Sequence, residues 1–342
     1  MQSSEFVPPP RRPFPKWVRI ASRIPLYGIA WPVIKTLELF GLWPRLLGRR
    51  SLGAGKAFGD YSPTAHDVIV CSYFKAGTTW TLQIATQIAF RGKAEFDNLH
   101  HVVPWPDVPA PPLARFIIPL DDPSPARLSP TGLRVIKTHL KKRDVPFTRE
   151  ARYIAVTRDP KDCAVSGYHF LRSLALGPLM PTVAHWIDYG LSPDFPDPWA
   201  EHLAAWWAAR HEPNVLFLTY EELRADHVGS VRRIAEFMGV ELTLGELAAV
   251  VEQSTFASMK AAGAKFEPGP IAPWGKDRVM MRRGTSGGSS ELLTPEQQQR
   301  IDEHCRAELA RIGCDFPYDT VFRARAPAAE PAFASASVSG QS

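Results

Sequence analysis

The segment from Asp67 to Trp80, which reads DVIVCSYFKAGTTW, constrains the fold more than any other part of the sequence. Its first half is a short β-rich apolar run and predicts a buried strand, whereas its second half has the spacing of a helix. Gly77 allows a tight turn between the two. Because a strand that runs directly into a helix is the start of a βαβ unit, this segment predicts a parallel sheet.

The same alternation of short apolar runs and helical patterns continues from residue 66 onward. A chain of 342 residues, 45% hydrophobic and 22% charged, can bury one large core. We therefore predict a single α/β domain with a central parallel β-sheet flanked by helices. The expected strands are Asp67–Ser72, Leu133–Lys137, Arg152–Thr157 and Asn214–Thr219, and the expected helices are Thr78–Phe90, Pro160–Leu174, Trp199–Arg210, Val228–Met238, Leu244–Glu252 and Pro295–Ile312.

Composition divides the chain into three parts. Residues 58–322 carry the α/β pattern, residues 1–57 form a basic, aromatic, Pro-containing leader, and residues 323–342 are rich in Ala, Ser and Pro, which predicts a disordered tail. Residues 97–130 are rich in Pro and Asp with little periodicity, and we expect them to form a long surface excursion near the functional site.

The leader holds much of the positive charge of a chain whose net charge is +5. Because the excess lies in one segment, the charge gives no indication of nucleic-acid binding. Prolines and charges interrupt the apolar run before about 18 residues accumulate, so no membrane span is predicted. Residues 11–50 fit two arrangements equally. One is an arm packed on the domain over its binding pocket, and the other is a helical element on an anionic membrane surface with the aromatic residues Trp17, Tyr27, Trp31, Phe40 and Trp43 at the interface.

The turn before the first helix predicts an anion-binding site. The first amides of a helix have no intrahelical partner, and the helix dipole adds positive potential there. Lys75 supplies a cation, the hydroxyls of Thr78 and Thr79 can donate to phosphate oxygens, and Trp80 could stack on a purine. In nucleoside-triphosphate loops the lysine follows the last glycine, whereas Lys75 precedes Gly77 here, so a P-loop kinase is the less favoured interpretation.

A second strand-to-helix junction follows between residues 152 and 170. Asp159 is placed to cap the helix, Pro160 suits its first position and Asp162 favours the dipole, so these three residues have a structural explanation. Arg158 and Ser166 lack such an explanation and could together hold a phosphate.

A third strand ends in Lys137 and His139, within the sequence VIKTHL. Histidine is suited to removing a proton from a hydroxyl near neutral pH. From the residues alone, however, a histidine after a strand is more often a structural hydrogen-bonding group.

Together these motifs resemble those of the cytosolic-type sulfotransferases that use 3′-phosphoadenosine 5′-phosphosulfate (PAPS). The chain looks like a bacterial-like member of that family. The loop of that family reads approximately Y-P-K-S-G-T-T-W, and this chain has Phe74 for the proline and Ala76 for the serine. The resemblance covers roughly residues 66–318 and implies a P-loop-like phosphosulfate-binding strand-loop-helix. It also implies His139 as general base, Lys137 as charge stabiliser and Lys75 at the leaving phosphate oxygen.

The resemblance further implies how PAPS would be bound as co-substrate. Its 5′ end would lie at the loop, its 3′-phosphate at Arg158, Ser166 and the Arg-Arg-Gly segment, and its adenosine at three residues further along the chain. After that segment the chain reads TSGGSS where the family commonly has Trp and Lys, so closure of residues 286–290 over PAPS is an open question. The implied contacts are Lys75, Ala76, Gly77, Thr78, Thr79, Trp80, Arg158, Ser166, Tyr220, Ser254, Phe256, Arg282, Arg283 and Gly284, with no metal.

The expected function is transfer of a sulfuryl group from PAPS to a hydroxyl of an apolar acceptor, such as a lipid-like alcohol, phenol or glycolipid, by in-line displacement without a metal. The alternative is a catalytically inactive nucleotide-binding protein of the same fold.

Four scattered cysteines favour a reducing, cytoplasmic location, at the inner membrane surface if the leader binds lipid. The sequence indicates no oligomeric state. Aromatic residues that could line the acceptor pocket are Trp105, Phe116, Trp186, Trp206 and Trp207.

Overall fold

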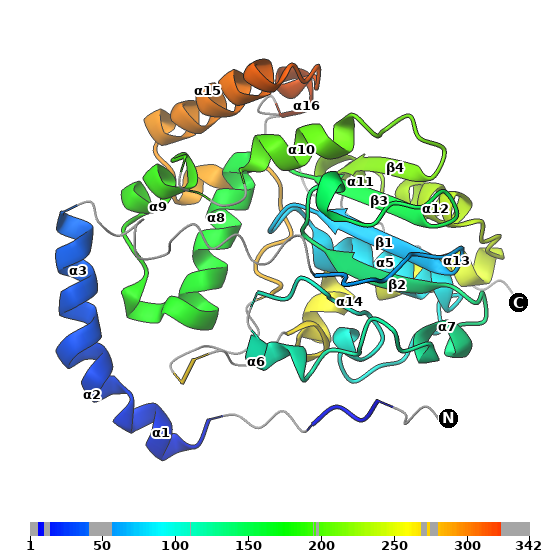
Figure 1. Cartoon of the computed structure of the whole chain (residues 1–342), viewed down its shortest axis with the longest axis horizontal. Helices are drawn as coiled ribbons and strands as arrows, with labels where there is room; N and C mark the ends of the chain where they lie inside the picture. Colours follow the sequence, from blue (N-terminus) through cyan, green and yellow to red (C-terminus); the bar gives the residue numbers. More distant parts are fainter. Residues whose placement is uncertain are drawn as a thin grey trace, which may run out of the picture.

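Four parallel strands form a central sheet in the order β2–β1–β3–β4 (Figure 1). The computed structural model describes residues 6–9, 14–40, 57–109, 111–193, 195, 198–267, 272–273 and 280–322. The strands are β1 (Asp67–Ser72), β2 (Arg134–Thr138), β3 (Arg152–Thr157) and β4 (Val215–Thr219). The predicted α/β domain with a parallel sheet is confirmed, and each strand lies within a residue of its expected position.

Both faces of the sheet are buried, as is usual when all strands are parallel. Side chains alternate along each strand, so Val68 and Val70 of β1 point into one apolar cluster while Ile69 and Cys71 point into another. The first cluster is covered by α5 (Thr78–Ala89), α12 (His227–Met238) and α13 (Leu244–Gln253). The second is closed by Trp206 of α10 (Trp199–Trp207), whose ring lies 6.0 Å from that of Tyr153.

A further group of helices packs beside the sheet: α8 (Pro160–Leu171), α9 (Val183–Gly190), α15 (Pro295–Ile312) and α16 (Tyr318–Phe322) (Figure 1). Its core includes an aromatic cluster in which Trp199 of α10 lies edge-on to Tyr318 and Phe322. The helix expected to reach Leu174 ends as an α-helix at Leu171 and continues as a π-turn over Arg172–Leu176. Gly177, with a φ of 53°, then ends the turn.

Helix starts follow the local sequence. Thr219, Thr243 and Thr294 each form a capping box with a glutamate or glutamine three residues later, at the starts of α11 (Tyr220–Ala225), α13 and α15. Asp159 caps α8, as predicted, by accepting a hydrogen bond from the backbone of Lys161. The remaining short elements of the domain are η3 (Leu99–His101), α6 (Pro111–Ala114), α7 (Ser124–Leu128), η4 (Lys142–Asp144), η6 (Gly177–Leu179), α14 (Phe256–Ala261), η7 (Gly263–Phe266) and η8 (Ser289–Glu291).

The segment 97–130 differs from the expected surface excursion. Leu99 and Val103 are buried in the same apolar cluster as β1, and Ile118 is buried as well. The prolines suppress regular periodicity, but they leave separate apolar residues that pack on the domain. The segment is therefore part of the core, and only parts of it lie at the surface.

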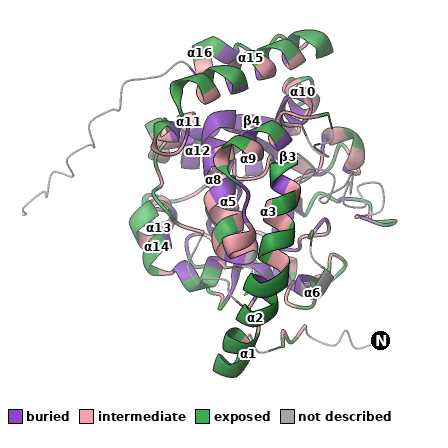
Figure 2. Cartoon of the chain, turned by 90° about the vertical axis from the view of Figure 1, so that its left-hand side faces the viewer, coloured by how far each residue is buried: buried purple, intermediate pink, exposed green. Residues whose placement is uncertain are grey.

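The leader is helical from Lys16 to Leu39 and docks on the domain by the second half of this segment. It comprises α1 (Lys16–Ala21), α2 (Arg23–Pro25), η1 (Leu26–Ala30) and α3 (Trp31–Leu39). In Figure 2 α3 runs down the face of the domain while α1 and α2 extend below it. Within the described ranges, no helix combines the length and apolar character needed to cross a membrane. Trp43 and the tail 323–342 lie outside the described residues.

Candidate active site

A cavity of about 620 Å³ opens at the carboxyl ends of the four strands. This edge is where ligands usually bind in open parallel sheets. Phe74 follows β1, His139 follows β2, Arg158 follows β3 and Tyr220 follows β4, and all four line the cavity. The two strand-to-helix junctions singled out in the sequence therefore face one common space, together with the candidate base.

The first junction has a backbone that only a small residue could adopt. Gly77 has a φ of 99°, and a Cβ built on it would lie 2.7 Å from Cδ2 of Tyr220. Lys75 also has a positive φ, of 66°. The Thr78 hydroxyl is 2.6 Å from the hydroxyl of Ser72, whereas Thr79 is half-buried in the cavity wall. The loop thus brings the unpaired first amides of α5 to the cavity, in the arrangement that binds anions.

Lys75 is held in an environment that disfavours its charge. Its Nζ lies 4.1 Å from the centroid of the Phe170 ring. Burial, and secondarily the charge of Arg158, lowers the pKa of Lys75 to about 8. An anion placed beside the ammonium would reverse this shift, so the site favours a negatively charged ligand.

Arg158 is only partly satisfied by the protein. Its Nη2 donates to Asp162 Oδ2 at 3.1 Å and to the carbonyl of Thr285 at 2.8 Å, and its Nη1 donates to the carbonyl of Lys75 at 3.4 Å. Its Nε is buried and has no hydrogen-bond partner among the described residues. Buried donors are nearly always paired in native proteins, so this group fits a ligand that carries an acceptor.

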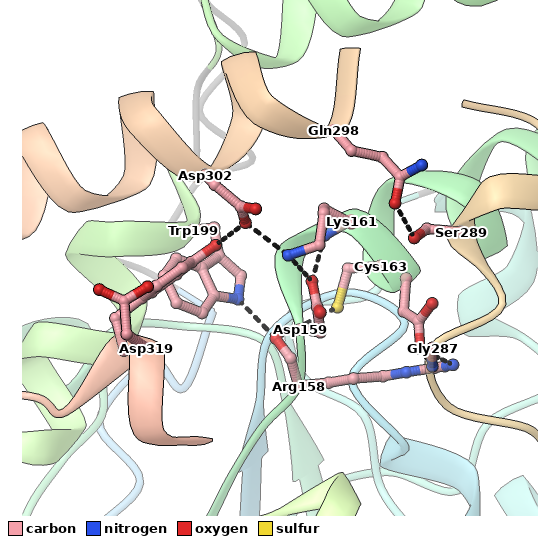
Figure 3. A network of polar contacts seen from close by, with 12 residues as sticks. Arg158, Asp159, Lys161, Cys163, Trp199, Gly287, Ser289, Gln298, Asp302 and Asp319 are labelled. Carbon is pink, nitrogen blue, oxygen red and sulfur yellow. Dashed lines mark hydrogen bonds and ion pairs between the residues drawn. The ribbon is translucent and has the colours of Figure 1, made fainter. Parts of the chain in front are cut away.

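The polar network in Figure 3 connects the junction between β3 and α8 to the neighbouring helices. Trp199 Nε1 donates to the carbonyl of Arg158 at 3.0 Å. Lys161 forms ion pairs with Asp159, at 3.1 Å, and with Asp302 of α15, which also accepts a hydrogen bond from Tyr318 at 2.6 Å. The end of β3 and the start of α8 are thereby tied to α10, α15 and α16.

Residues 280–288 form another wall of the cavity. Gly284 has a φ of 67°, and a Cβ there would lie 2.3 Å from Cδ2 of Phe256, so the segment passes close to that ring. The backbone of Gly287 donates to Asp162 Oδ2 at 2.9 Å. Thr285 and Gly288 line the cavity, which places part of the Gly-Ser stretch beside Arg158.

Arg282 and Arg283 both line the cavity and both form ion pairs with Glu291 of η8. The same carboxylate lies 3.4 Å from Nε2 of His169. Two arginines in the cavity wall are thus balanced by one acidic side chain.

The residues expected at an adenosine are divided between the cavity wall and the layer beneath it. Trp80, Tyr220 and Phe256 line the cavity, and the rings of Trp80 and Tyr220 are 5.5 Å apart. Ser254 is fully buried: its carbonyl accepts a hydrogen bond from Trp80 Nε1 at 2.8 Å, and its hydroxyl donates to the carbonyl of Val250 at 2.6 Å. Ser166 lines the cavity, whereas Ala76 and Ser254 are buried and do not line it.

The hydrogen bonds of His139 fix its tautomer. Nδ1 lies 2.8 Å from the carbonyl oxygen of Ser72, which can only accept, so Nδ1 carries the proton and Nε2 carries the lone pair. Burial, with a smaller contribution from Lys137, lowers the pKa of His139 well below its ordinary value. The ring is therefore neutral at pH 7 and able to accept a proton.

Asp107 interacts with both His139 and Lys137, and the sequence analysis did not identify it. Its Oδ2 accepts a hydrogen bond from the backbone of His139 at 2.8 Å, although 32 residues separate the two. Burial raises the pKa of Asp107. Burial lowers the pKa of Lys137 to about 7, while the charge of Asp107 opposes that shift. No local motif marks Asp107, because it lies in the aperiodic Pro-rich segment.

The remaining wall of the cavity is mainly apolar, but it uses other aromatic residues than expected. Trp105 and Trp186 line it, whereas Phe116, Trp206 and Trp207 do not. Trp206 is 1% exposed in the core beneath the sheet. Trp207 packs on Phe217 and Phe316, because α10 lies between the sheet and α15. Further apolar lining residues are Phe170, Leu174, Tyr189, Phe195, Met259 and Met281.

Comparison with known proteins gives consistent results. The family model described as the sulfotransferase domain matches residues 65–313. Rabbit (Oryctolagus cuniculus) sulfotransferase 1C2 is 28% identical over 273 residues, covering 73% of this chain and 85% of the relative. Mouse (Mus musculus) sulfotransferase 6B1 is 28% identical over 298 residues, covering 83% and 84%. Among solved structures, a mouse sulfotransferase complexed with PAP aligns with a TM-score of 0.58 and 26% identity, covering 76% of this chain and 90% of that one. A retinol dehydratase complexed with androsterone and PAP has the same fold, with a TM-score of 0.58 and 23% identity over 75% of this chain and 84% of that one.

Proposed function

Since the chain belongs to the sulfotransferase domain family, we propose that its cavity transfers the sulfuryl group of PAPS to a hydroxyl of an apolar acceptor, with His139 as the base. The chain is a PAPS-dependent sulfotransferase. The observation that carries the proposal is that Lys75, Arg158 and His139 line one cavity at the carboxyl ends of the strands.

The donor fits the residues present. PAPS carries anions at both ends, and the cavity offers Lys75 with the start of α5 at one junction and Arg158 with its unpaired Nε at the other. Ser166, Arg282 and Arg283 would add to the second phosphate site, and Trp80, Tyr220 and Phe256 would bound the adenine. PAPS supplies an activated sulfur whose bond to a phosphate oxygen can be broken.

The protein would act by positioning groups around an in-line displacement. His139 Nε2 accepts the proton of the acceptor hydroxyl, whose oxygen forms a bond to sulfur as the bond from sulfur to the phosphate oxygen breaks. Lys75 stabilises the charge that develops on that phosphate oxygen, and Lys137 adds positive charge nearby. Fixed charges in a site shielded from water are an effective source of such catalysis.

The apolar part of the cavity wall favours an apolar acceptor. Trp105 and Trp186 line the same cavity as His139. The ring of Phe74 packs edge-on against the His139 ring, with 6.4 Å between the ring centroids. Apolar pockets with a few placed polar groups are typical of small-molecule sites. A phenol, a lipid-like alcohol or a glycolipid with one accessible hydroxyl fits this arrangement.

The proposal is tested with PAPS labelled in its sulfur. The purified protein is incubated with a panel of phenols, sterols, fatty alcohols, glycolipids and, as a polar comparison, simple sugars. Transfer to the apolar acceptors is expected, with little to the sugars. Nucleotide binding measured by calorimetry, without transfer to any acceptor, would instead support an inactive nucleotide-binding protein. Tighter binding of ATP with magnesium than of PAP would support a kinase.

All four cysteines, Cys71, Cys163, Cys305 and Cys314, are free thiols, and the first three are buried. Cysteines without disulfide partners fit a reducing compartment, which supports a cytoplasmic location as part of this proposal. Within the described part of the chain, no cluster of three or more His, Cys, Asp or Glu residues could hold a metal ion.

A further inference from the structure

The N-terminal arm, residues 16–40, presents an apolar stripe that the domain does not cover. Trp17, Ile20, Ile24, Tyr27 and Trp31 follow one another at intervals of three or four residues, the spacing of one helix face. The residues Trp17, Ile20 and Ile24 are 71%, 65% and 78% exposed. Ile29, Val33, Leu39 and Phe40 of the arm are also more than half exposed. Among the described residues outside the arm, the large apolar residues exposed to this extent are Val7, Leu128 and Leu244, which lie far apart in the sequence. An exposed apolar row of this kind marks an interaction surface.

The charges beside the stripe are of one sign. Lys16, Arg19 and Arg23 are exposed on α1 and α2. The one acidic residue in the arm, Glu38, is buried, with its side chain 4% exposed. Anionic surfaces attract such clusters of cations, whereas a second copy of the same arm would repel them. The charge pattern therefore favours an anionic partner over self-association.

The arm is held by the domain at its other end. Glu38 accepts a hydrogen bond from the backbone of Thr182 and lies 3.0 Å from His185 Nδ1. Lys35 donates to the carbonyl of Met180 at 3.3 Å, and Leu26 is buried. The exposed stripe is thus carried on a fixed helical support, and α1 and α2 project beyond the domain in Figure 2.

We propose that the arm is a docking surface for an anionic lipid bilayer, with the stripe Trp17–Trp31 in the interface and the three cations at the headgroups. Helices with aromatic and aliphatic residues on one face and Lys or Arg beside them lie in this way at membrane surfaces. The arm binds η6 and the start of α9, and α9 contributes Trp186 and Tyr189 to the acceptor cavity. If the proposed function holds, this arrangement suits an acceptor that is presented from the bilayer.

The test uses the full chain and sedimentation with vesicles. Phosphatidylcholine vesicles are compared with vesicles in which about a third of the lipid is phosphatidylglycerol. Binding is expected to the anionic vesicles and is expected to weaken with added salt. The variant Arg19→Gln/Arg23→Gln should lower the partition coefficient by about 30-fold, at roughly fivefold for each cation. The variant Trp17→Ser/Ile20→Ser/Ile24→Ser should abolish binding.

The control variants carry changes of the same kind elsewhere on the surface. Arg232→Gln/Arg233→Gln removes two exposed cations from α12, and Leu128→Ser/Leu244→Ser removes two exposed apolar side chains outside the arm. Both should bind vesicles as the unmodified chain does. Failure of the unmodified chain to bind anionic vesicles, or equal losses in the controls, would overturn the proposal. So would sedimentation velocity showing that the stripe variant only converts a dimer to a monomer.

Transfer to a small water-soluble phenol is measured in parallel, without vesicles. The arm variants should retain this activity, because the arm does not line the cavity. Vesicle binding without transfer by the unmodified chain would contradict the proposed function and leave the docking surface standing. Transfer without vesicle binding would support the proposed function and contradict the docking surface.

Discussion

His139 is neutral, oriented and placed at the cavity, as a general base must be. Its Nδ1 proton is held by the carbonyl of Ser72, so Nε2 is the atom that accepts. His139→Ala should lower kcat by at least about 100-fold, the usual contribution of a general base. Binding of PAP, measured by calorimetry, should be unchanged. His211→Ala, which alters an exposed histidine, should leave both quantities unchanged, and undiminished transfer by the His139 variant would refute the assignment.

Asp107 is expected to act through its neighbours. Asp107→Asn keeps an oxygen that can accept from the backbone of His139, but it removes the negative charge that raises the pKa of Lys137. The pKa of Lys137 should therefore fall further, and the alkaline limb of the kcat profile should move to lower pH, with kcat reduced by about tenfold. A loss of activity without any shift of the limb would indicate a purely structural role.

Lys75 predicts a pH dependence of nucleotide binding. Burial lowers its pKa to about 8 in the free protein, so the side chain is charged below that pH and must take up a proton to bind an anion above it. Affinity for PAP should fall as the pH rises through 8, by up to about tenfold for each pH unit. In Lys75→Arg this slope should disappear, whereas in Lys137→Arg it should persist. Calorimetric titration between pH 7 and 10, a range of about three units around that pKa, would measure it.

At the scale of elements, the junction between β3 and α8 depends on a buried ion-pair network. Lys161 has a side chain only 10% exposed and is paired with Asp302 of α15. Asp302→Asn leaves Lys161 paired with Asp159 alone and also weakens the hydrogen bond from Tyr318, so the free energy of unfolding should fall by about 2 kcal/mol.

The matched control is the exposed pair between Arg306 and Asp319 of α15 and α16. Arg306→Gln should change the free energy of unfolding by less than about 1 kcal/mol, because exposed ion pairs contribute little. Urea unfolding of the two variants measures both values. Equal effects would mean that the Lys161 network does not stabilise the junction.

At the scale of the molecule, the cavity is built from segments far apart in the chain: the loop after β1, the helix after β3 and residues 280–288. A nucleotide that touches all three should stabilise the whole domain. PAP at about 100 times its Kd should add roughly 2.7 kcal/mol and raise Tm by several degrees. AMP at the same concentration, which lacks the 3′-phosphate, should raise Tm less; an equal shift from both would exclude Arg158 from 3′-phosphate recognition.

Local sequence was sufficient for the strands, the helix starts and the two strand-to-helix junctions that line the cavity. A short continuous run of apolar residues defines a strand such as β1, Asp159 and Pro160 define the start of α8, and Gly77 marks the turn, because each depends on neighbours in the chain. The positions of Lys75, Arg158 and His139 follow from the same patterns, since parallel strands end at one edge of the sheet.

Contacts between distant segments had no local signal and were decided by packing. Asp107 reaches His139 across 32 residues, and Ser254 supports Trp80 across 174. Trp186 and Trp206 are both buried on helices, yet Trp186 lines the cavity and Trp206 does not. The reason is that α9 packs on α8 and α15, whereas Trp206 of α10 packs on Tyr153 of β3. Helix periodicity shows that a side chain lies on an apolar face, and only the tertiary structure shows what that face meets.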